Sequence, residues 1–156
     1  MAICEKAGET YKLNKIEPLK GDNKNVRYLS INPTGHIPMI EDGMFKVLGG
    51  NHIIFVFLCK SKANISQKLM PAELDLKIKG ILGWHQAKML VPGQQMFRIL
   101  YEPSAFASPP SLASLNKWRE DMLSCLKALD EKLVGDSFLC GNKMTIGDIV
   151  VFNELS

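Results

Sequence analysis

The residues best suited to a chemical role lie in one short stretch, NPTGHIPMIEDG, which spans residues 32–43. An Asn-Pro-Thr-Gly turn leads into an apolar run centred on Pro38, and the run ends at an Asp-Gly turn. Proline cannot donate a hydrogen bond to a strand ladder, so it is confined to edges, bulges and strand starts. We therefore expect this stretch to present its main chain to something other than a neighbouring strand.

The bond between Ile37 and Pro38 is the candidate for a cis peptide bond, because only X–Pro bonds adopt the cis form at low cost. A trans proline in an ordinary edge strand is the more common arrangement. The residues alone leave both alternatives open.

The same stretch and the residues behind it, NPTGHIPMIEDGMFKVL, resemble the segment N-P-x-G-x-[VI]-P-x-[IL]-x-D-G-x-F-x-L of cytosolic glutathione transferases, especially theta-like ones. A second stretch at residues 138–155, FLCGNKMTIGDIVVFNEL, is similar to the F-L-x-G-x-x-x-[ST]-x-[AG]-D-[IL] motif of the helical domain of that family. The resemblance covers nearly the whole chain. It implies an α/β thioredoxin-like domain (incomplete, with its first strand missing) followed by an all-α helical domain, with glutathione bound along the strand that carries a cis proline.

The chain has 156 residues, a length that suits one domain or two small ones. The resemblance divides it into a partial thioredoxin-like, glutathione-binding domain at 1–61, a linker at 62–72 and a partial all-helical C-terminal domain at 73–156. The hydrophobic content of 46% is sufficient for packed cores and argues against disorder.

Composition argues against several other classes of protein. A net charge of +3, from 19 basic and 16 acidic residues, is too small for a nucleic-acid-binding surface. The longest apolar run, Ile53–Cys59, is much shorter than the ~20 residues of a membrane-spanning helix. The first residues lack the layout of a secretion signal. The four cysteines lack metal-type spacing, so we expect no metal and reduced, half-buried thiols in a cytoplasmic protein.

In the first half of the chain, apolar spacing and turn residues predict short elements. These are the tail of a helix at Met1–Lys6, a strand at Tyr11–Ile16, a short helical or irregular piece at Val26–Leu29, and strands at Pro38–Glu41 and Phe45–Leu48 joined by Asp42-Gly43. Asn51 is expected to cap the segment that follows. Residues 53–58 suit a strand or a helix equally on propensity, and the resemblance implies a helix.

The second half is predicted to be helical. We expect helices over Glu73–Leu90, broken or kinked at Pro92-Gly93, and over Ser111–Val134, whose apolar stripe ends before a capping Gly135. Residues 96–101 are expected to continue the first helix, and residues 102–110 are not.

Thr145 and Asp148 have the spacing of a capping box. In this arrangement the threonine oxygen accepts from the Asp148 amide, and the carboxylate accepts from the Thr145 amide. The resemblance implies a structural role for the box.

Glutathione is an extended tripeptide with two carboxylates, an ammonium and a thiol, and an exposed strand-like edge suits such a ligand. The resemblance implies that the main chain of Ile37, beside Pro38, pairs with the cysteinyl unit. His36 and Asn23 match polar positions on the glycyl side.

Gly50 and Asn51 stand where the family has a Glu-Ser pair at a helix N-terminus, which is a natural carboxylate site. Asn51 can still donate to a carboxylate. Gly50 cannot hold the ammonium, so one salt link is expected to be missing or supplied by another group, including one from a partner subunit.

Each of these residues has a simpler interpretation. His36 can be a solvent-facing loop residue, and Asn51 a helix cap. Trp84 and His85 match a helix that borders the electrophile pocket in the family, or they pack at a domain interface. Cys4 is expected to be a small buried hydrophobe.

The resemblance implies a chain truncated at both ends, because the family's first strand and its thiol-activating serine or tyrosine precede the helix with which this sequence begins. We assign no catalytic residue. The expected function is conjugation of the glutathione thiol to hydrophobic electrophiles for detoxification, by a cytoplasmic homodimer, with weak or no activity in this fragment. A non-catalytic module for protein–protein association is the alternative, and the residues also leave open a chain that does not fold alone. The electrophile is not fixed by these residues.

Overall fold

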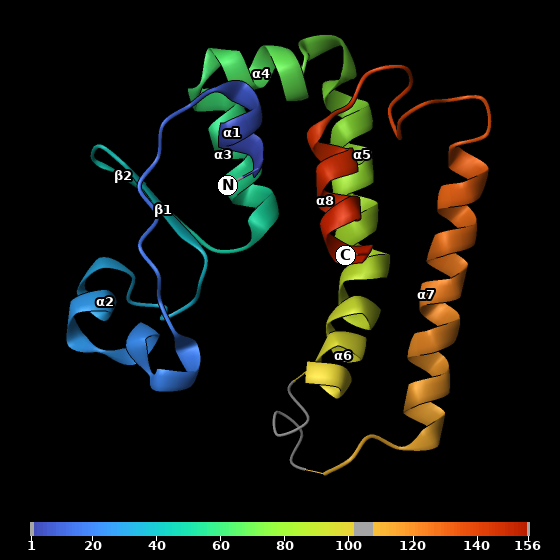
Figure 1. Ribbon diagram of the computed structural model, residues 1–156, viewed down its shortest axis with the longest axis horizontal. Helices are drawn as coiled ribbons and strands as arrows, with labels where there is room; N and C mark the ends of the chain where they lie inside the picture. The colour runs from blue at the N-terminus through green and yellow to red at the C-terminus, as the bar shows by residue number, and fades with distance from the viewer. Residues whose placement is uncertain (1, 102–107, 156) are drawn as a thin grey trace. The chain divides into compact units, whose positions relative to one another are not determined.

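The computed structural model describes residues 2–101 and 108–155, and the chain divides into two compact units, Met1–Pro71 and Ala72–Ser156. Figure 1 shows the elements of each unit. Unit 1 combines helices with a two-stranded sheet, whereas unit 2 is built from helices.

Unit 1 begins with short helices and ends with longer ones. Its elements are α1 (Ala2–Ala7), the 3-10 turns η1 (Pro18–Lys20) and η2 (Asp22–Lys24), α2 (Val26–Ile31), β1 (Met39–Asp42), β2 (Phe45–Leu48), α3 (Asn51–Ser61) and α4 (Ala63–Leu69). The helix predicted for the ambiguous residues 53–58 is confirmed as part of α3.

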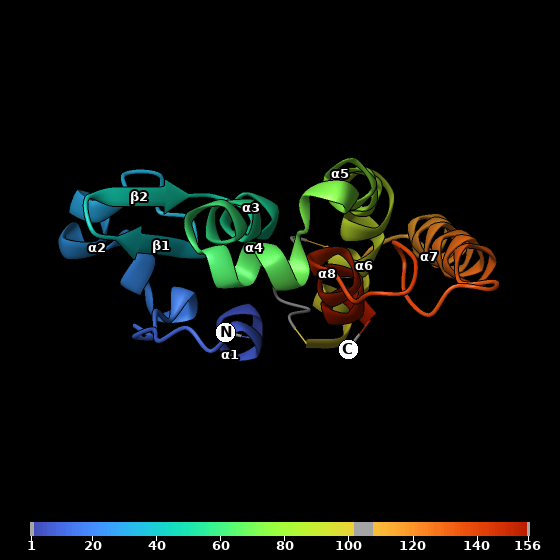
Figure 2. The ribbon, with the colours of Figure 1, turned by 90° about the horizontal axis from the view of Figure 1, so that it is seen from above.

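The two strands form an antiparallel hairpin, drawn as opposed arrows in Figure 2. Met39 pairs with Leu48 at one end of the hairpin, and Asp42 pairs with Phe45 at the other. The turn therefore consists of Gly43 and the residue after it, one position later than predicted. Gly43 has a φ of +61°, which glycine adopts without steric cost.

Two other predictions for unit 1 are wrong. Residues 11–16 form no strand, because in the described part of the chain β1 pairs only with β2 and no ladder reaches this segment. The segment predicted as a linker, 62–72, contains the helix α4, which buries Ile65 and Leu69 in unit 1. The segment is polar when its residues are taken together, so the sequence analysis gave no weight to these two apolar residues. They lie four positions apart and therefore on one helix face.

The cap of α3 also differs from the prediction. Gly50 occupies the N-cap position, and its carbonyl accepts from the amide of Ile53 at 3.1 Å. Asn51 is the first helical residue, and its side chain lies outside the described part of the structure. The helix thus begins one residue earlier than the cap signal predicted.

Unit 2 is helical along most of its length. Its elements are the 3-10 turn η3 (Ala72–Leu74), α5 (Asp75–Trp84), the π-helical turn η4 (His85–Met89), α6 (Leu90–Tyr101), α7 (Leu112–Lys132) and α8 (Ile146–Leu155). The break predicted at Pro92-Gly93 is wrong, because the helix continues from η4 through both residues into α6. The kink predicted as the alternative stays a prediction. Most of the predicted non-helical segment 102–110 lies outside the described residues. Within the described ranges, no helix has the length and apolar character to cross a membrane.

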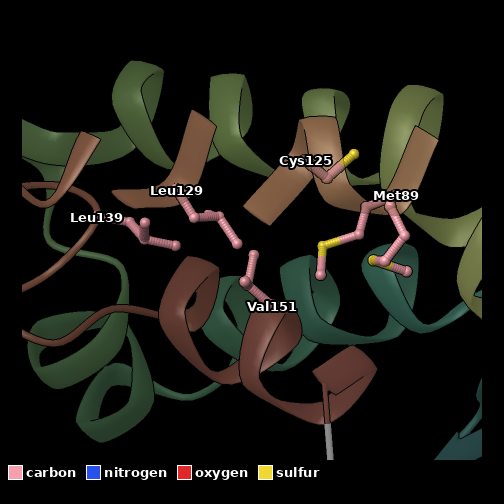
Figure 3. Close-up of a cluster of buried hydrophobic side chains, with 6 residues drawn as sticks. Met89, Cys125, Leu129, Leu139 and Val151 are labelled. Carbon is pink, nitrogen blue, oxygen red and sulfur yellow. The ribbon is translucent and has the colours of Figure 1, made fainter. Parts of the chain in front are cut away.

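The core of unit 2 joins four elements. Met89 from η4, Cys125 and Leu129 from α7, Leu139 from the connecting loop and Val151 from α8 are all buried in one cluster. Figure 3 shows these side chains directed into the space between the helices. The central part of the apolar stripe predicted for α7 is thus confirmed as the face that enters the core, whereas Leu133 at the end of the stripe is exposed.

The capping box before α8 is present, with one changed hydrogen bond. Asp148 Oδ2 accepts from the Thr145 amide at 2.7 Å, as predicted. The Thr145 hydroxyl, however, donates to Oδ2 at 2.9 Å, whereas the prediction had it accepting from the Asp148 amide. Asp148 Oδ1 also accepts from the Leu139 amide at 2.8 Å, so the carboxylate joins the core loop to the start of α8.

Replacement of Asp148 by alanine should lower the free energy of unfolding by about 2 kcal/mol, because amides of buried residues lose their acceptor. Urea denaturation followed by circular dichroism measures this difference. The matched control is Asp130→Ala on the exposed face of α7, which should change the free energy by less than about 0.5 kcal/mol. Equal stability of the two variants would contradict the structural role of the box.

The four cysteines are free thiols, and all of them are buried. The prediction of reduced thiols agrees with this, although burial is more complete than expected. Cys59 is the extreme case, since burial raises its pKa to about 11. Burial likewise raises the pKa values of Cys125 and Cys140.

At pH 8, Cys59 should react with an aromatic disulfide reagent about 100-fold more slowly than an unperturbed thiol, because the thiolate is the reactive form. Mass spectrometry of the labelled native protein measures the rate at this residue. In guanidinium chloride all four thiols should react rapidly. Rapid labelling of Cys59 in the native state would show that it is not enclosed in unit 1.

Candidate functional site

The candidate site is the segment between α2 and β1. The Ile37–Pro38 peptide bond is cis, as predicted. Ile37 as a whole residue is 42% exposed, and no hydrogen bond of its amide or carbonyl is found in the part of the chain that the structure describes. Unsatisfied main-chain groups at an exposed position are available to an extended peptide.

His36 lies beside these groups with an exposed side chain, so the structure permits either a ligand contact or a solvent-facing role. Asn23 lies on the other side of the same turn. Its side-chain amide donates to the Gly35 carbonyl at 2.9 Å. Gly35 has a φ of +67°, and a Cβ there would lie 3.3 Å from the Asn23 carbonyl oxygen. Asn23 therefore holds the turn directly, a structural role that the sequence analysis did not assign to it.

Asn32 is the residue of this site that the sequence analysis missed. Its side chain is fully buried and is hydrogen-bonded to both Thr34 and His36. The available signal was the Asn-Pro-x-Gly turn itself, since asparagine side chains commonly close such turns by bonding the main chain two residues on.

The register of the hairpin brings the two halves of the candidate site together. Because Met39 pairs with Leu48, Pro38 and the residues that open α3 lie at the same end of the two strands. Gly50 and Asn51 are therefore at the same end of the hairpin as Ile37. In the described part of α3, the first turn carries no acidic residue, so a cationic group of a ligand has no carboxylate partner there.

An ion pair near the other end of the hairpin ties this arrangement to α3. Lys62, the residue after α3, lies with its Nζ 3.0 Å from Asp42 Oδ2 at the end of β1. The hydrogen bond to Asp42 raises the pKa of Lys62. Both groups are solvent-accessible, so the pair aligns the elements more than it stabilises the fold.

Trp84 and His85 belong to unit 2. Trp84 is partly buried and packs against the core cluster. His85 is buried to 97%, with its Nε2 3.3 Å from Glu154 Oε2 on α8. Both side chains therefore contribute to the interior of the helical unit, and this placement favours packing over a surface that receives a substrate.

Comparison with known proteins supports the interpretation of the two motifs. The profile of the family "Glutathione S-transferase, C-terminal domain" matches residues 95–156. Human glutathione S-transferase theta-2 is 26% identical over 157 aligned residues, covering 98% of this chain. Mouse glutathione S-transferase theta-3 is also 26% identical. The chain spans 63% of the length of human theta-2.

Solved structures agree on the fold. The crystal structure of human glutathione transferase theta-2, in complex with glutathione and an unknown ligand, superposes with a TM-score of 0.83 at 22% identity over 98% of this chain and 63% of that one. Poplar glutathione transferase F1 gives 0.81 at 20% identity, over 98% and 71%. This agreement supports the expected fold class, a thioredoxin-like domain followed by an all-α domain. The chain is therefore similar in sequence to theta-type glutathione S-transferases and shares the fold of the solved glutathione transferases.

Proposed function

We propose that unit 1 binds glutathione along the Ile37–Pro38 segment and that the whole protein serves conjugation of its thiol to hydrophobic electrophiles. One observation carries the proposal: Ile37 is an exposed residue whose amide and carbonyl form no hydrogen bond among the described residues. An extended peptide can satisfy both groups at once, as an added strand does. The human theta-2 structure, which contains glutathione, supports this ligand.

The γ-glutamyl carboxylate is placed by this proposal at the start of α3. A helix N-terminus favours an anion through its main-chain amides and the helix dipole. Gly50 and Asn51 form this end of the helix, which the hairpin register brings to the Ile37 side. The glycyl carboxylate is assigned to the side of the turn that carries His36 and Asn23.

Conjugation also requires a group that stabilises the thiolate, the nucleophilic form of the ligand. We assign this role to no residue of the described site, so we expect glutathione binding with weak conjugation. Detoxification, a cytoplasmic location and assembly as a homodimer remain parts of the proposal that rest on the relatives.

A non-catalytic module for protein association is the second candidate. It is favoured by the first turn of α3, where no described acidic side chain is present to hold the ligand's ammonium. Glutathione binding without turnover of a chromogenic electrophile would still fit both candidates, whereas an absence of glutathione binding would leave only the second.

Titration of ¹⁵N-labelled protein with glutathione should shift the amide cross-peaks of Ile37, Gly50 and Asn51, because the ligand contacts these main-chain groups. S-Methylglutathione should give the same shifts, since the thiol proton is not needed for binding. Amides of α7 serve as the internal control and should not move. Shifts confined to other residues, or none at ~10 mM glutathione, which corresponds to a binding free energy weaker than about −3 kcal/mol, would contradict the proposal.

Replacement of His36 by alanine should weaken glutathione binding by about 10-fold, the effect of losing one hydrogen bond to a charged group. Isothermal titration calorimetry measures the loss. An analogue that lacks the glycyl residue, γ-glutamylcysteine amide, should bind the variant and the parent protein equally. The control is Lys24→Ala, an exposed cation on the preceding turn. An equal loss for both ligands would place His36 away from the glycyl carboxylate.

A further inference from the structure

The polar interior of the turn before Pro38 contains a side chain that the proposed function leaves unexplained. Asn32 follows α2 and has no exposed surface. A buried amide group destabilises a protein unless its donors and acceptors are satisfied. The hydrogen-bond partners of Asn32 therefore indicate the structural role of this buried side chain.

Asn32 closes the turn from within. Its Oδ1 accepts from the Thr34 amide at 3.1 Å and from the Thr34 hydroxyl at 2.6 Å. Its main-chain carbonyl accepts from the Gly35 amide at 3.0 Å. The remaining side-chain group, Nδ2, donates forward along the chain to the His36 carbonyl at 2.6 Å.

The His36 carbonyl receives a second hydrogen bond. The hydroxyl of Tyr28, a buried residue of α2, donates to it at 2.7 Å. The same hydroxyl accepts from Asn32 Nδ2 at 3.5 Å. Two buried donors, one within α2 and one at its C-cap, therefore fix the position of one oxygen. An oxygen that accepts two hydrogen bonds from buried donors is held in one position.

Fixing that oxygen also fixes the Ile37 amide. The His36 carbonyl and the Ile37 N–H belong to one planar peptide unit, and in a trans unit they point in opposite directions. The Ile37–Pro38 bond is the cis bond found in the described chain, so the preceding unit is trans. With the oxygen held toward Tyr28 and Asn32, the Ile37 N–H is directed away from the interior.

We propose that Asn32 and Tyr28 are positioning residues that aim the Ile37 amide at the backbone of the bound tripeptide. This inference rests on the proposed function and adds residues that do not touch the ligand. Because the Ile37 N–H is already oriented in the free protein, binding loses less conformational entropy than it would if this peptide unit were mobile. The affinity for glutathione should therefore depend on two buried side chains behind the site.

Two substitutions remove the donors with little change of shape. Tyr28→Phe deletes the hydroxyl. Asn32→Asp keeps the acceptor for Thr34 but replaces the Nδ2 donor with an oxygen that repels the His36 carbonyl. The matched control is Asn25→Asp, which introduces the same charge at the N-cap of α2 and retains the oxygen that accepts from the Tyr28 amide.

Calorimetry with glutathione should show binding about 5-fold to 10-fold weaker for Tyr28→Phe and at least as weak for Asn32→Asp, and unchanged for Asn25→Asp. A second readout separates positioning from stability. In ¹⁵N spectra of Tyr28→Phe, the ligand-induced shift of the Ile37 amide should shrink, while the melting temperature and the cross-peaks of α3 stay close to those of the parent protein.

Each outcome is decisive. Affinity within twofold of the parent for both variants, with glutathione still bound by the parent, would overturn the positioning role alone. Loss of affinity that occurs only together with loss of the folded spectrum in both variants would also overturn it, in favour of a structural role. If the parent protein does not bind glutathione, both this inference and the proposed function fail.

Discussion

The arrangement of the candidate site depends on the hydrogen bonds that converge on the His36 carbonyl. Main-chain polar groups inside a protein must be paired, and the turn before Pro38 pairs its own through Asn32, Tyr28 and Thr34. This internal pairing leaves the next main-chain groups, those of Ile37, as the unsatisfied ones at the surface. In the described structure, the main-chain groups on the buried side of this turn are hydrogen-bonded, whereas those of Ile37 on the exposed side form no hydrogen bond. The proposed ligand, which has a peptide backbone, can pair with both groups of such a segment.

The hairpin gives this open segment its second contact region. Strand pairing fixes where β2 ends relative to where β1 begins, and only the two residues between Leu48 and Asn51 separate β2 from α3. A main-chain donor–acceptor pair and a helix N-terminus therefore lie at one end of the hairpin. Glutathione carries a peptide backbone and a terminal carboxylate, which match these two features. In the proposed complex the exposed His36 side chain refines the fit, whereas Asn23 holds the turn through its hydrogen bond to the Gly35 carbonyl.

The sequence predicted those elements whose signals are local. The Asp-Gly turn, the stripe of α7, the capping box and the Ile37–Pro38 segment depend on neighbouring residues, and each is present, with the hairpin turn displaced by one residue. The strand predicted at Tyr11–Ile16 failed because a strand exists only with a partner, which local alternation cannot supply. The helix α4 was missed because average polarity concealed its two buried residues. In the site, Asn32 was missed because a turn signal specifies local geometry and does not show which carbonyl a buried side chain will hold.

Amide hydrogen exchange at Ile37 tests the central claim most directly, because it reports whether this one N–H is free before the ligand arrives and bound afterwards. The account predicts fast exchange of the Ile37 amide in the free protein, beside slow exchange at the paired amides of β1 and β2, and marked slowing at Ile37 when glutathione is added. Protection of the Ile37 amide in the free protein, or an exchange rate that saturating glutathione leaves unchanged, would contradict it.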